Sequence, residues 1–208
     1  IGAIFAHEKR FWDGGVRSAS GWSAQTLGGV AGKVLGIAGM GAIGAEAAKM
    51  AQAVGLKVVA LTKGSALAVP GVTRAESLAD LFSQSDHLVL TMPLTDETRG
   101  IVDSAMLSTA RPGLHLINVA RGALIDQEAL IMALDAGHLS AATLDVTEPE
   151  PLPPGHALYS HPKVRLTPHV SGSCEAGEAR TSSLLCENLT LFLAGLPIPY
   201  TLARNRGY

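Results

Sequence analysis

The sequence predicts an α/β fold, a doubly wound parallel sheet with helices packed on both faces. Three observations predict it. Short apolar runs alternate along the chain with stretches of helical spacing, which is the pattern of βαβ units. These runs show little alternation of polar and apolar residues, as expected of strands buried on both faces. A glycine pattern, Gly39-x-Gly41-x-x-Gly44, follows the first run directly and opens the next helical stretch.

Six apolar runs are the expected strands. They are residues 34–38, 58–61, 87–91, 114–119, 142–146 and 164–167. The expected helices are residues 42–54, 75–84, 103–110, 126–137 and 177–195. Residues 1–11 also have helical spacing but no capping residue in front of them, so we expect a preceding segment to be missing from this chain. The proline-rich stretch 149–156 is expected to be an extended loop and not a domain linker.

The composition supports a large core and excludes several classes of partner. The chain has 208 residues, of which 47% are hydrophobic and 16% charged. Its formal net charge is −2, and its aromatic residues are four Phe, two Trp and three Tyr. With no basic stripe or aromatic platform we expect no nucleic-acid partner, and with no polybasic helix or long apolar span we expect no membrane partner.

Cysteine usage favours a reducing compartment. The cysteines are Cys174 and Cys186. If both lie on one helix, they are separated by about 18 Å, which is beyond the reach of a disulfide. The short apolar start also precedes its charges, unlike a secretory signal. We therefore expect a reduced, cytoplasmic protein.

The glycine turn indicates a dinucleotide site. Gly39 permits a tight turn, Gly41 removes a side chain that would block a pyrophosphate, and Gly44 lets the helix approach the strand. The helix N-terminus then offers free N–H groups and a positive dipole end to phosphate. The alternative is a purely structural turn, because a chain with 23 glycines matches the pattern at times by chance. Its place within a βαβ unit favours binding.

Four polar residues are candidates for chemistry. Arg121, Asp145, Glu150 and His169 lie at or after the C-terminal ends of expected strands, where open parallel sheets bind their ligands. An arginine, an acid and a histidine together can polarise a carbonyl, tune an imidazole and transfer a proton.

Other interpretations of these residues stay open. Arg121 before a glycine also fits a surface residue in a tight turn, His169 also fits a satisfied loop histidine, and Glu148 is a rival to Glu150. A metal site is not expected, because the spacing of His156, His161, His169 and Cys174 fits no common zinc pattern. A Cys174–His169 nucleophile pair lacks a third group to orient it.

Five motifs carry a resemblance to a known family. From about Gly28 to Pro197 the chain contains GKVLGIAGMGAIG, MPLTDETRGIV, INVARGALIDQEAL, LDVTEPEPLP and TPHVSG, in this order. It resembles the D-isomer-specific 2-hydroxyacid dehydrogenases, and its sequence at residues 145–153 looks most like the glyoxylate/hydroxypyruvate reductases of that family. The resemblance implies a Rossmann domain that binds NAD(P)H and reduces a small 2-keto acid to a D-2-hydroxy acid.

The resemblance also assigns roles to residues. Arg121 would bind the carboxylate and carbonyl of the substrate, Glu150 would pair with the catalytic His169, and Asp145 would contact the nicotinamide carboxamide. The glycine turn, the end of the second strand and the resemblance together predict these cofactor-binding residues: Gly39, Met40, Gly41, Ala42, Ile43, Gly44, Thr62, Lys63, Met92, Pro93, Thr98, Val119, Ala120, Arg121, Asp145, His169, Val170, Ser171 and Gly172.

The end of the second strand predicts the choice of cofactor. Thr62 stands where the family has an Asp that binds the ribose 2′-OH, and residues 57–75 contain no carboxylate. Thr62 and Ser65 can donate hydrogen bonds, and Lys63 adds a positive charge. We expect NADP(H) to be preferred, with NAD(H) possible. The alternative is that Thr62 tolerates either cofactor and Lys63 points to solvent.

The resemblance implies a division of the chain and a homodimer. Residues 1–16 would be an inter-domain connecting helix, 17–170 the cofactor domain, and 171–208 a C-terminal helix returning toward a second, largely absent substrate domain. Phe11, Trp12 and Trp22 cluster in a loop and suggest an interface between two copies. The alternative is that they pack on their own connecting helix. The rival functions are a dinucleotide-sensing module, like the corepressors of this fold, and a catalytically incomplete cofactor-binding fragment.

Overall fold

The computed structural model describes residues 1–11, 18, 21–24, 26–64, 69–175 and 177–199. The chain divides into two compact units, Ile1–Pro168 and His169–Tyr208. Each unit is described separately.

The first unit is built on a parallel sheet. In the described residues it has seven strands: β1 (Val34–Ala38), β2 (Lys57–Leu61), β3 (Thr73–Arg74), β4 (His87–Leu90), β5 (Leu114–Asn118), β6 (Leu139–Leu144) and β7 (Val164–Leu166). Their order is β3-β2-β1-β4-β5-β6-β7, and all neighbours pair in parallel. The chain therefore reverses direction across the sheet between β1 and β4, which is where doubly wound sheets bind ligands. The predicted doubly wound sheet is confirmed.

The helices of this unit are short, and several begin at a side-chain cap. Those described are α1 (Gly2–Glu8), α2 (Ala42–Ala53), α3 (Leu78–Gln84), α4 (Ser104–Ser108), the 3-10 helix η3 (Gly122–Leu124), α5 (Gln127–Asp135) and α6 (Ala157–Ser160). Ser77 accepts a hydrogen bond from Asp80 N, Asp103 from Met106 N, and Asp126 from Glu128 N and Ala129 N. Because these residues act as N-caps, α3, α4 and α5 begin later than expected.

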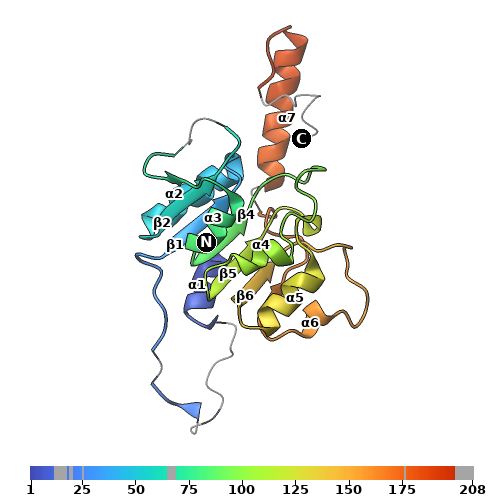
Figure 1. The fold of residues 1–208 in the computed structure, drawn as a ribbon. Coiled ribbons are helices and arrows are strands. Elements are labelled where there is room, and N and C mark those ends of the chain that lie inside the picture. Colours follow the sequence, from blue (N-terminus) through green and yellow to red (C-terminus); the bar gives the residue numbers. More distant parts are fainter. Residues whose placement is uncertain (12–17, 19–20, 25, 65–68, 176, 200–208) are drawn as a thin grey trace. The chain divides into compact units, whose positions relative to one another are not determined.

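The two faces of the sheet carry separate cores. On one face, Ile4 of α1 and Ala48 of α2 pack with Ile37, Val89 and Ile117. On the other face, Phe82 of α3, Leu107 of α4 and Leu130 of α5 pack with strand residues such as Leu88 and Leu116. Helices flank the sheet on both sides (Figure 1). Successive strand residues point to opposite faces, so an uninterrupted apolar run supplies both cores.

Two strands differ from the expectation. The sheet has a strand, β3, that was not predicted, because its two residues are exposed and carry no apolar signal. β6 covers Leu139–Leu144 and not the predicted 142–146. Its first half contains Ser140, whose hydroxyl donates to the Leu114 carbonyl (3.3 Å), so a polar residue there is satisfied within the sheet. Asp145 and Val146 follow the strand as part of the next loop.

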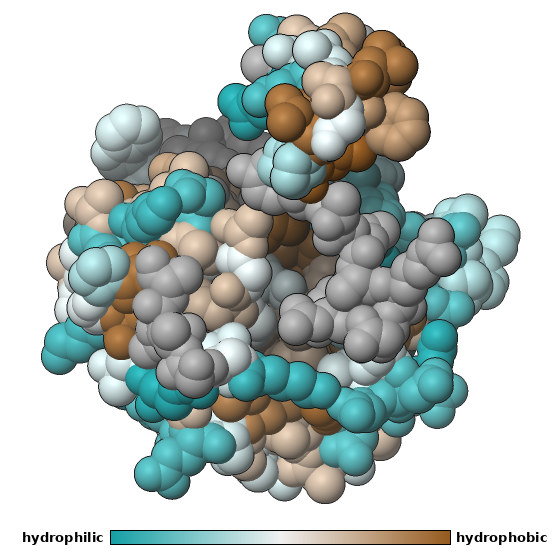
Figure 2. Space-filling view, turned by 90° about the horizontal axis from the view of Figure 1, so that it is seen from above, coloured by the Kyte–Doolittle hydropathy of each residue, from teal (hydrophilic) through white to brown (hydrophobic). Residues whose placement is uncertain are grey.

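The second unit contains α7 (Gly177–Leu193). Apolar side chains are exposed on this helix, among them Leu185, Phe192 and Leu193 (Figure 2). Both cysteines are free and exposed, and Cys174 precedes α7, so the two do not share one helix. In the part of the chain that the structure describes, no helix has the length and apolar character needed to cross a membrane.

Candidate functional site

The turn after β1 uses its three glycines in three different ways. Gly39 has a φ of +110°, and a Cβ there would lie 2.7 Å from the backbone N of Met92. A Cβ on Gly44 would lie 2.2 Å from the Gly39 carbonyl oxygen, whereas a Cβ on Gly41 would meet nothing within 4 Å. Thr91 fixes the turn from the end of β4, because its hydroxyl donates to the Gly39 carbonyl (2.7 Å). Gly39 and Gly44 are thus required by packing, and Gly41 faces open space.

The N-terminus of α2 adjoins that space with N–H groups that have no partner within the helix. Gly41 is the N-cap and supplies no side-chain hydrogen bond to the first turn. Ile43 in this turn is 65% exposed. Uncapped N–H groups and the positive end of the helix dipole suit an anion such as a pyrophosphate. The residues present therefore fit the phosphates of a dinucleotide, with Ala42 and Ile43 as the backbone donors.

The end of β2 is held by a strand that the sequence did not reveal. Arg74 of β3 donates from Nη1 to the Thr62 carbonyl (3.1 Å) and from Nη2 to the Gly64 carbonyl. The Gly64 N–H donates to the Thr62 hydroxyl (3.3 Å). Lys63 is exposed and forms an ion pair with Glu97 of the loop after β4. The hydrogen bond and charge of Lys63 lower the pKa of the Glu97 carboxyl.

The loop after β4 begins beside the glycine turn with Met92 and continues through Pro93 and Thr98. Met92 is buried and contacts Gly39 closely. The Thr98 hydroxyl donates to the Pro93 carbonyl (2.8 Å) and accepts from Thr95 N (2.8 Å), and the residue is 9% exposed. Thr98 therefore shapes this loop from within.

Asn118 at the end of β5 positions Arg121. Its side chain is fully buried; Oδ1 accepts from Ala120 N (3.0 Å) and Nδ2 donates to the Arg121 carbonyl (2.9 Å). The Arg121 side chain is exposed, and Nη1 donates to the Ala120 carbonyl (2.6 Å). Sequence reasoning missed Asn118, although its position as the last residue of an apolar run, directly before the turn, was a usable signal.

The loop after β6 brings two acids to the same edge. Asp145 is 3% exposed; its N–H donates to the Asn118 carbonyl (2.9 Å), and its Oδ1 accepts from the Thr167 hydroxyl (2.5 Å). Glu150 Oε1 accepts from Thr147 N (3.0 Å). The backbone of Thr147 packs on Gly122, where a Cβ would lie 2.0 Å from its carbonyl carbon.

Glu148, the rival of Glu150, is anchored differently. Its backbone N–H donates to Gln127 Oε1 (3.2 Å), and its carbonyl accepts from Gln127 Nε2 (2.6 Å).

The Gly122–Thr147 contact joins the Arg121 turn to the loop of Asp145 and Glu150. The structure brings these three predicted residues to the adjoining C-terminal ends of β5 and β6.

His169 begins the second unit. It has a φ of +53°, in the left-handed region that residues other than glycine rarely adopt. Val170, Ser171 and Gly172 follow it directly. Because His169 and Glu150 belong to different units, their pairing stays a prediction, as do the cofactor contacts of residues 169–172.

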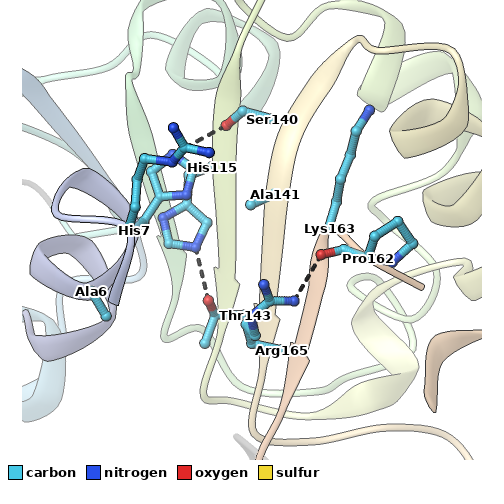
Figure 3. Close-up of a pocket in the computed structure, with 10 residues that line it drawn as sticks. Ala6, His7, His115, Ser140, Ala141, Thr143, Pro162, Lys163 and Arg165 are labelled. Carbon is cyan, nitrogen blue, oxygen red and sulfur yellow. Dashed lines mark hydrogen bonds between the residues drawn. The ribbon is translucent and has the colours of Figure 1, made fainter. Parts of the chain in front are cut away.

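A cavity of about 340 Å³ lies over β5, β6 and β7 on the α1 side. His7 stacks on His115 with ring centroids 4.4 Å apart, and the other polar residues of the cavity wall include Ser140, Thr143, Lys163 and Arg165 (Figure 3). None of the candidate site residues lines it. Within the described ranges no group of three or more His, Cys, Asp or Glu side chains is arranged to hold a metal ion.

The strand order and the glycine turn at the β1–β4 reversal define a dinucleotide-binding Rossmann domain. The chain belongs to the family described as D-isomer specific 2-hydroxyacid dehydrogenase, NAD binding domain, whose model matches residues 1–171. The resemblance found in the sequence is thereby confirmed.

Three relatives illustrate the likeness. A glyoxylate reductase of Aeropyrum pernix is 36% identical over 198 residues, covering 93% of this chain and 59% of the relative. A D-isomer specific 2-hydroxyacid dehydrogenase structure from Xanthobacter autotrophicus Py2, with NADPH and MES, is 32% identical at a TM-score of 0.87, covering 99% of this chain and 85% of that one. An NADPH-dependent glyoxylate/hydroxypyruvate reductase structure from Sinorhizobium meliloti, with NADP and sulfate, is 30% identical at 0.82, covering 90% and 60%.

The chain covers only part of the curated relatives. It spans 59% of the Aeropyrum glyoxylate reductase and 32% of a D-3-phosphoglycerate dehydrogenase of Bacillus subtilis, to which it is 37% identical.

Proposed function

We propose that the protein carrying this chain is an oxidoreductase that uses NAD(P)H to reduce a small 2-keto acid to a D-2-hydroxy acid. Glyoxylate and hydroxypyruvate are the first substrates to test, because relatives named for them match this chain. The observation that carries the proposal is the Gly122–Thr147 contact, which brings Arg121 to the same sheet edge as Asp145 and Glu150.

Each residue has a role in this reaction. The nicotinamide would supply the hydride to the carbonyl carbon. The Arg121 guanidinium would hold the substrate carboxylate and polarise the carbonyl. His169 would protonate the carbonyl oxygen, and Glu150 would stabilise the imidazolium form of His169. Asp145 would orient the nicotinamide carboxamide, and Thr167 holds the Asp145 side chain by donating a hydrogen bond to Oδ1.

The proposed cofactor is NADP(H), with NAD(H) as the weaker alternative. Its support is the end of β2, where Thr62 and Lys63 replace the usual acid. The Xanthobacter structure contains NADPH and the Sinorhizobium structure contains NADP.

We also propose a cytoplasmic homodimer formed through the cofactor domain, residues 17–170. Trp22 of this domain is 82% exposed and Phe11 of the preceding segment is 71% exposed, and large exposed aromatics often anchor interfaces. Trp12 lies outside the described residues. Sedimentation at micromolar concentration should show a dimer; a monomer would contradict the proposal. The flanking segments 1–16 and 171–208 are proposed to connect this domain to a substrate domain.

The rival function is a dinucleotide-sensing module. The experiment that separates the two is a panel of 2-keto acids, glyoxylate and hydroxypyruvate included, offered with NADPH and with NADH. Loss of reduced-nicotinamide absorbance with at least one acid, abolished in Arg121→Gln, supports the enzyme. Tight cofactor binding without turnover of any acid by the protein that carries this chain would favour the sensing module.

A further inference from the structure

The ion pair between Lys63 and Glu97 joins the two loops that border the glycine turn. β1 pairs with β2 on one side and with β4 on the other. The loops that follow β2 and β4 therefore stand on either side of the turn after β1. Lys63 begins the first of these loops, and Glu97 lies in the second, 34 residues further along the chain. Two walls of the expected cofactor crevice are thus linked by one pair of charges.

The position of Lys63 is set by its backbone neighbours. Arg74 donates to the carbonyls of Thr62 and Gly64, which precede and follow Lys63 in the chain. The Lys63 backbone is therefore anchored on both sides, and its side chain extends from a fixed point to Glu97. The side chains of Lys63 and Glu97 are 80% and 74% exposed, so both remain accessible to a ligand.

We propose that Glu97 is a specificity-determining residue that weakens binding of the 2′-phosphate of NADP(H) by competing for Lys63. A 2′-phosphate and the Glu97 carboxylate are both anions that seek the same ammonium group. Binding of NADP(H) replaces the Lys63–Glu97 ion pair with one between Lys63 and the 2′-phosphate. Binding of NAD(H), which has a 2′-hydroxyl, requires no such replacement. Thr62 and Lys63 then favour the phosphorylated cofactor, and Glu97 limits how strongly they do so. This inference rests on the proposed cofactor site.

The test compares two neighbouring carboxylates of one loop. Glu97→Gln removes the charge that pairs with Lys63. Asp96→Asn removes the same charge from the adjacent exposed residue, whereas the ion pair described for Lys63 is with Glu97. Kd values for NADPH and NADH, and for the fragments 2′,5′-ADP and 5′-AMP, are measured by calorimetry. Glu97→Gln should tighten NADPH and 2′,5′-ADP by ~2- to 5-fold, the size expected of an exposed ion pair, with NADH and 5′-AMP within error. Asp96→Asn should leave the NADPH/NADH ratio unchanged.

A double-variant cycle tests whether Glu97 acts on cofactor binding through Lys63. In a Lys63→Gln background, Glu97→Gln should no longer change the NADPH/NADH ratio. The inference is overturned if Glu97→Gln alters both cofactors equally or neither, if Asp96→Asn gives the same shift, or if the effect persists without Lys63. These outcomes do not depend on which cofactor the unmodified protein prefers, because they concern how a substitution changes the NADPH/NADH affinity ratio. An unmodified protein that bound NADH more tightly than NADPH would contradict the preference and leave this test intact.

Discussion

The Nδ1 atoms of His87 and His115 lie 3.2 Å apart, with both side chains only 1% exposed. The polar chain continues in both directions: His115 Nε2 lies 2.8 Å from the Thr143 hydroxyl, and His87 Nε2 lies 3.1 Å from Glu8 Oε1. Lys33 contacts the same Glu8 oxygen at 2.5 Å. Two facing Nδ1 atoms share one hydrogen only if one ring donates and the other accepts. The accepting ring is therefore neutral, and burial, which lowers the pKa of both histidines, keeps the donating ring neutral near pH 7 as well.

This buried pair makes stability depend on acid pH. Burial is the main cause that lowers the pKa of His87 to about 4 and of His115 to about 2; Glu8 partly offsets it at His87, while His7 reinforces it at both. An unfolded histidine titrates near 6.5, so the unfolded chain takes up protons first. Each histidine should cost about 1.4 kcal/mol of unfolding free energy per pH unit below about 6.5. The His87 contribution should level off below pH ~4, and that of His115 should continue toward ~2.

Urea unfolding between pH 7 and 4.5 measures this dependence. The double variant His87→Gln/His115→Gln should lose stability less steeply with falling pH than the unmodified chain, whatever its stability at pH 7. His138→Gln, at an exposed histidine, is the matched control and should keep the original slope. Equal slopes for all three proteins would contradict the buried neutral pair.

Gly122 should be intolerant of a side chain. A Cβ there overlaps the backbone of Thr147, so Gly122→Ala must displace the loop that carries Asp145 and Glu150. Overpacking of this kind costs about 1–3 kcal/mol. Gly29→Ala, where a Cβ meets nothing within 4 Å, should stay within about 0.5 kcal/mol of the original. Denaturant midpoints measure both, and similar losses in the two variants would show that the Gly122–Thr147 contact is unimportant.

His169→Asn should lower kcat by ~10²–10⁴, the range for general acid–base catalysis. The affinity for NADPH should change little, since the proton donor acts on the substrate. Single-turnover and steady-state rates with the accepted 2-keto acid measure the effect. A nearly normal rate would remove His169 from the proposed mechanism.

Glu150→Gln should shift the pH optimum of the reduction toward acid. In the proposed pairing the Glu150 carboxylate favours the protonated form of the proton donor, so without it the reduction needs a higher proton concentration. Glu148→Gln is the control from the same loop, because the Glu148 backbone is bound to Gln127 instead. A shift in the Glu148 variant and none in the Glu150 variant would reverse the assignment.

Thr62→Asp should reverse the cofactor preference. A carboxylate at the end of β2 accepts hydrogen bonds from a ribose 2′-OH and repels a 2′-phosphate. The Kd for NADPH should rise and that for NADH should fall in the same titrations. Thr62→Ser, which keeps the hydroxyl, should retain the original order. Tighter NADPH binding by the Thr62→Asp protein would show that Thr62 lies away from the ribose.

The sequence by itself determined the sheet and the turn that opens the site. Runs such as 34–38 and 58–61 are apolar on both sides of the pleat, and this pattern can be recognised without knowing which segments pack against them. Gly39, Gly41 and Gly44 are likewise informative in sequence, because their spacing reflects local backbone geometry. The family resemblance followed from ordered motifs for the same reason.

Only the tertiary structure decided which distant residues meet. β3 has two exposed residues and exists because Arg74 pairs beside β2. The bond from Thr167 to Asp145 spans 22 positions and the pair of Lys63 with Glu97 spans 34, distances over which spacing carries no information. The neutrality of His87 depends on its burial beside His115 of another strand, and it is opposed by Glu8 of α1. Short-range patterns record the conformation of one segment, whereas contacts and pKa values depend on how the folded segments pack.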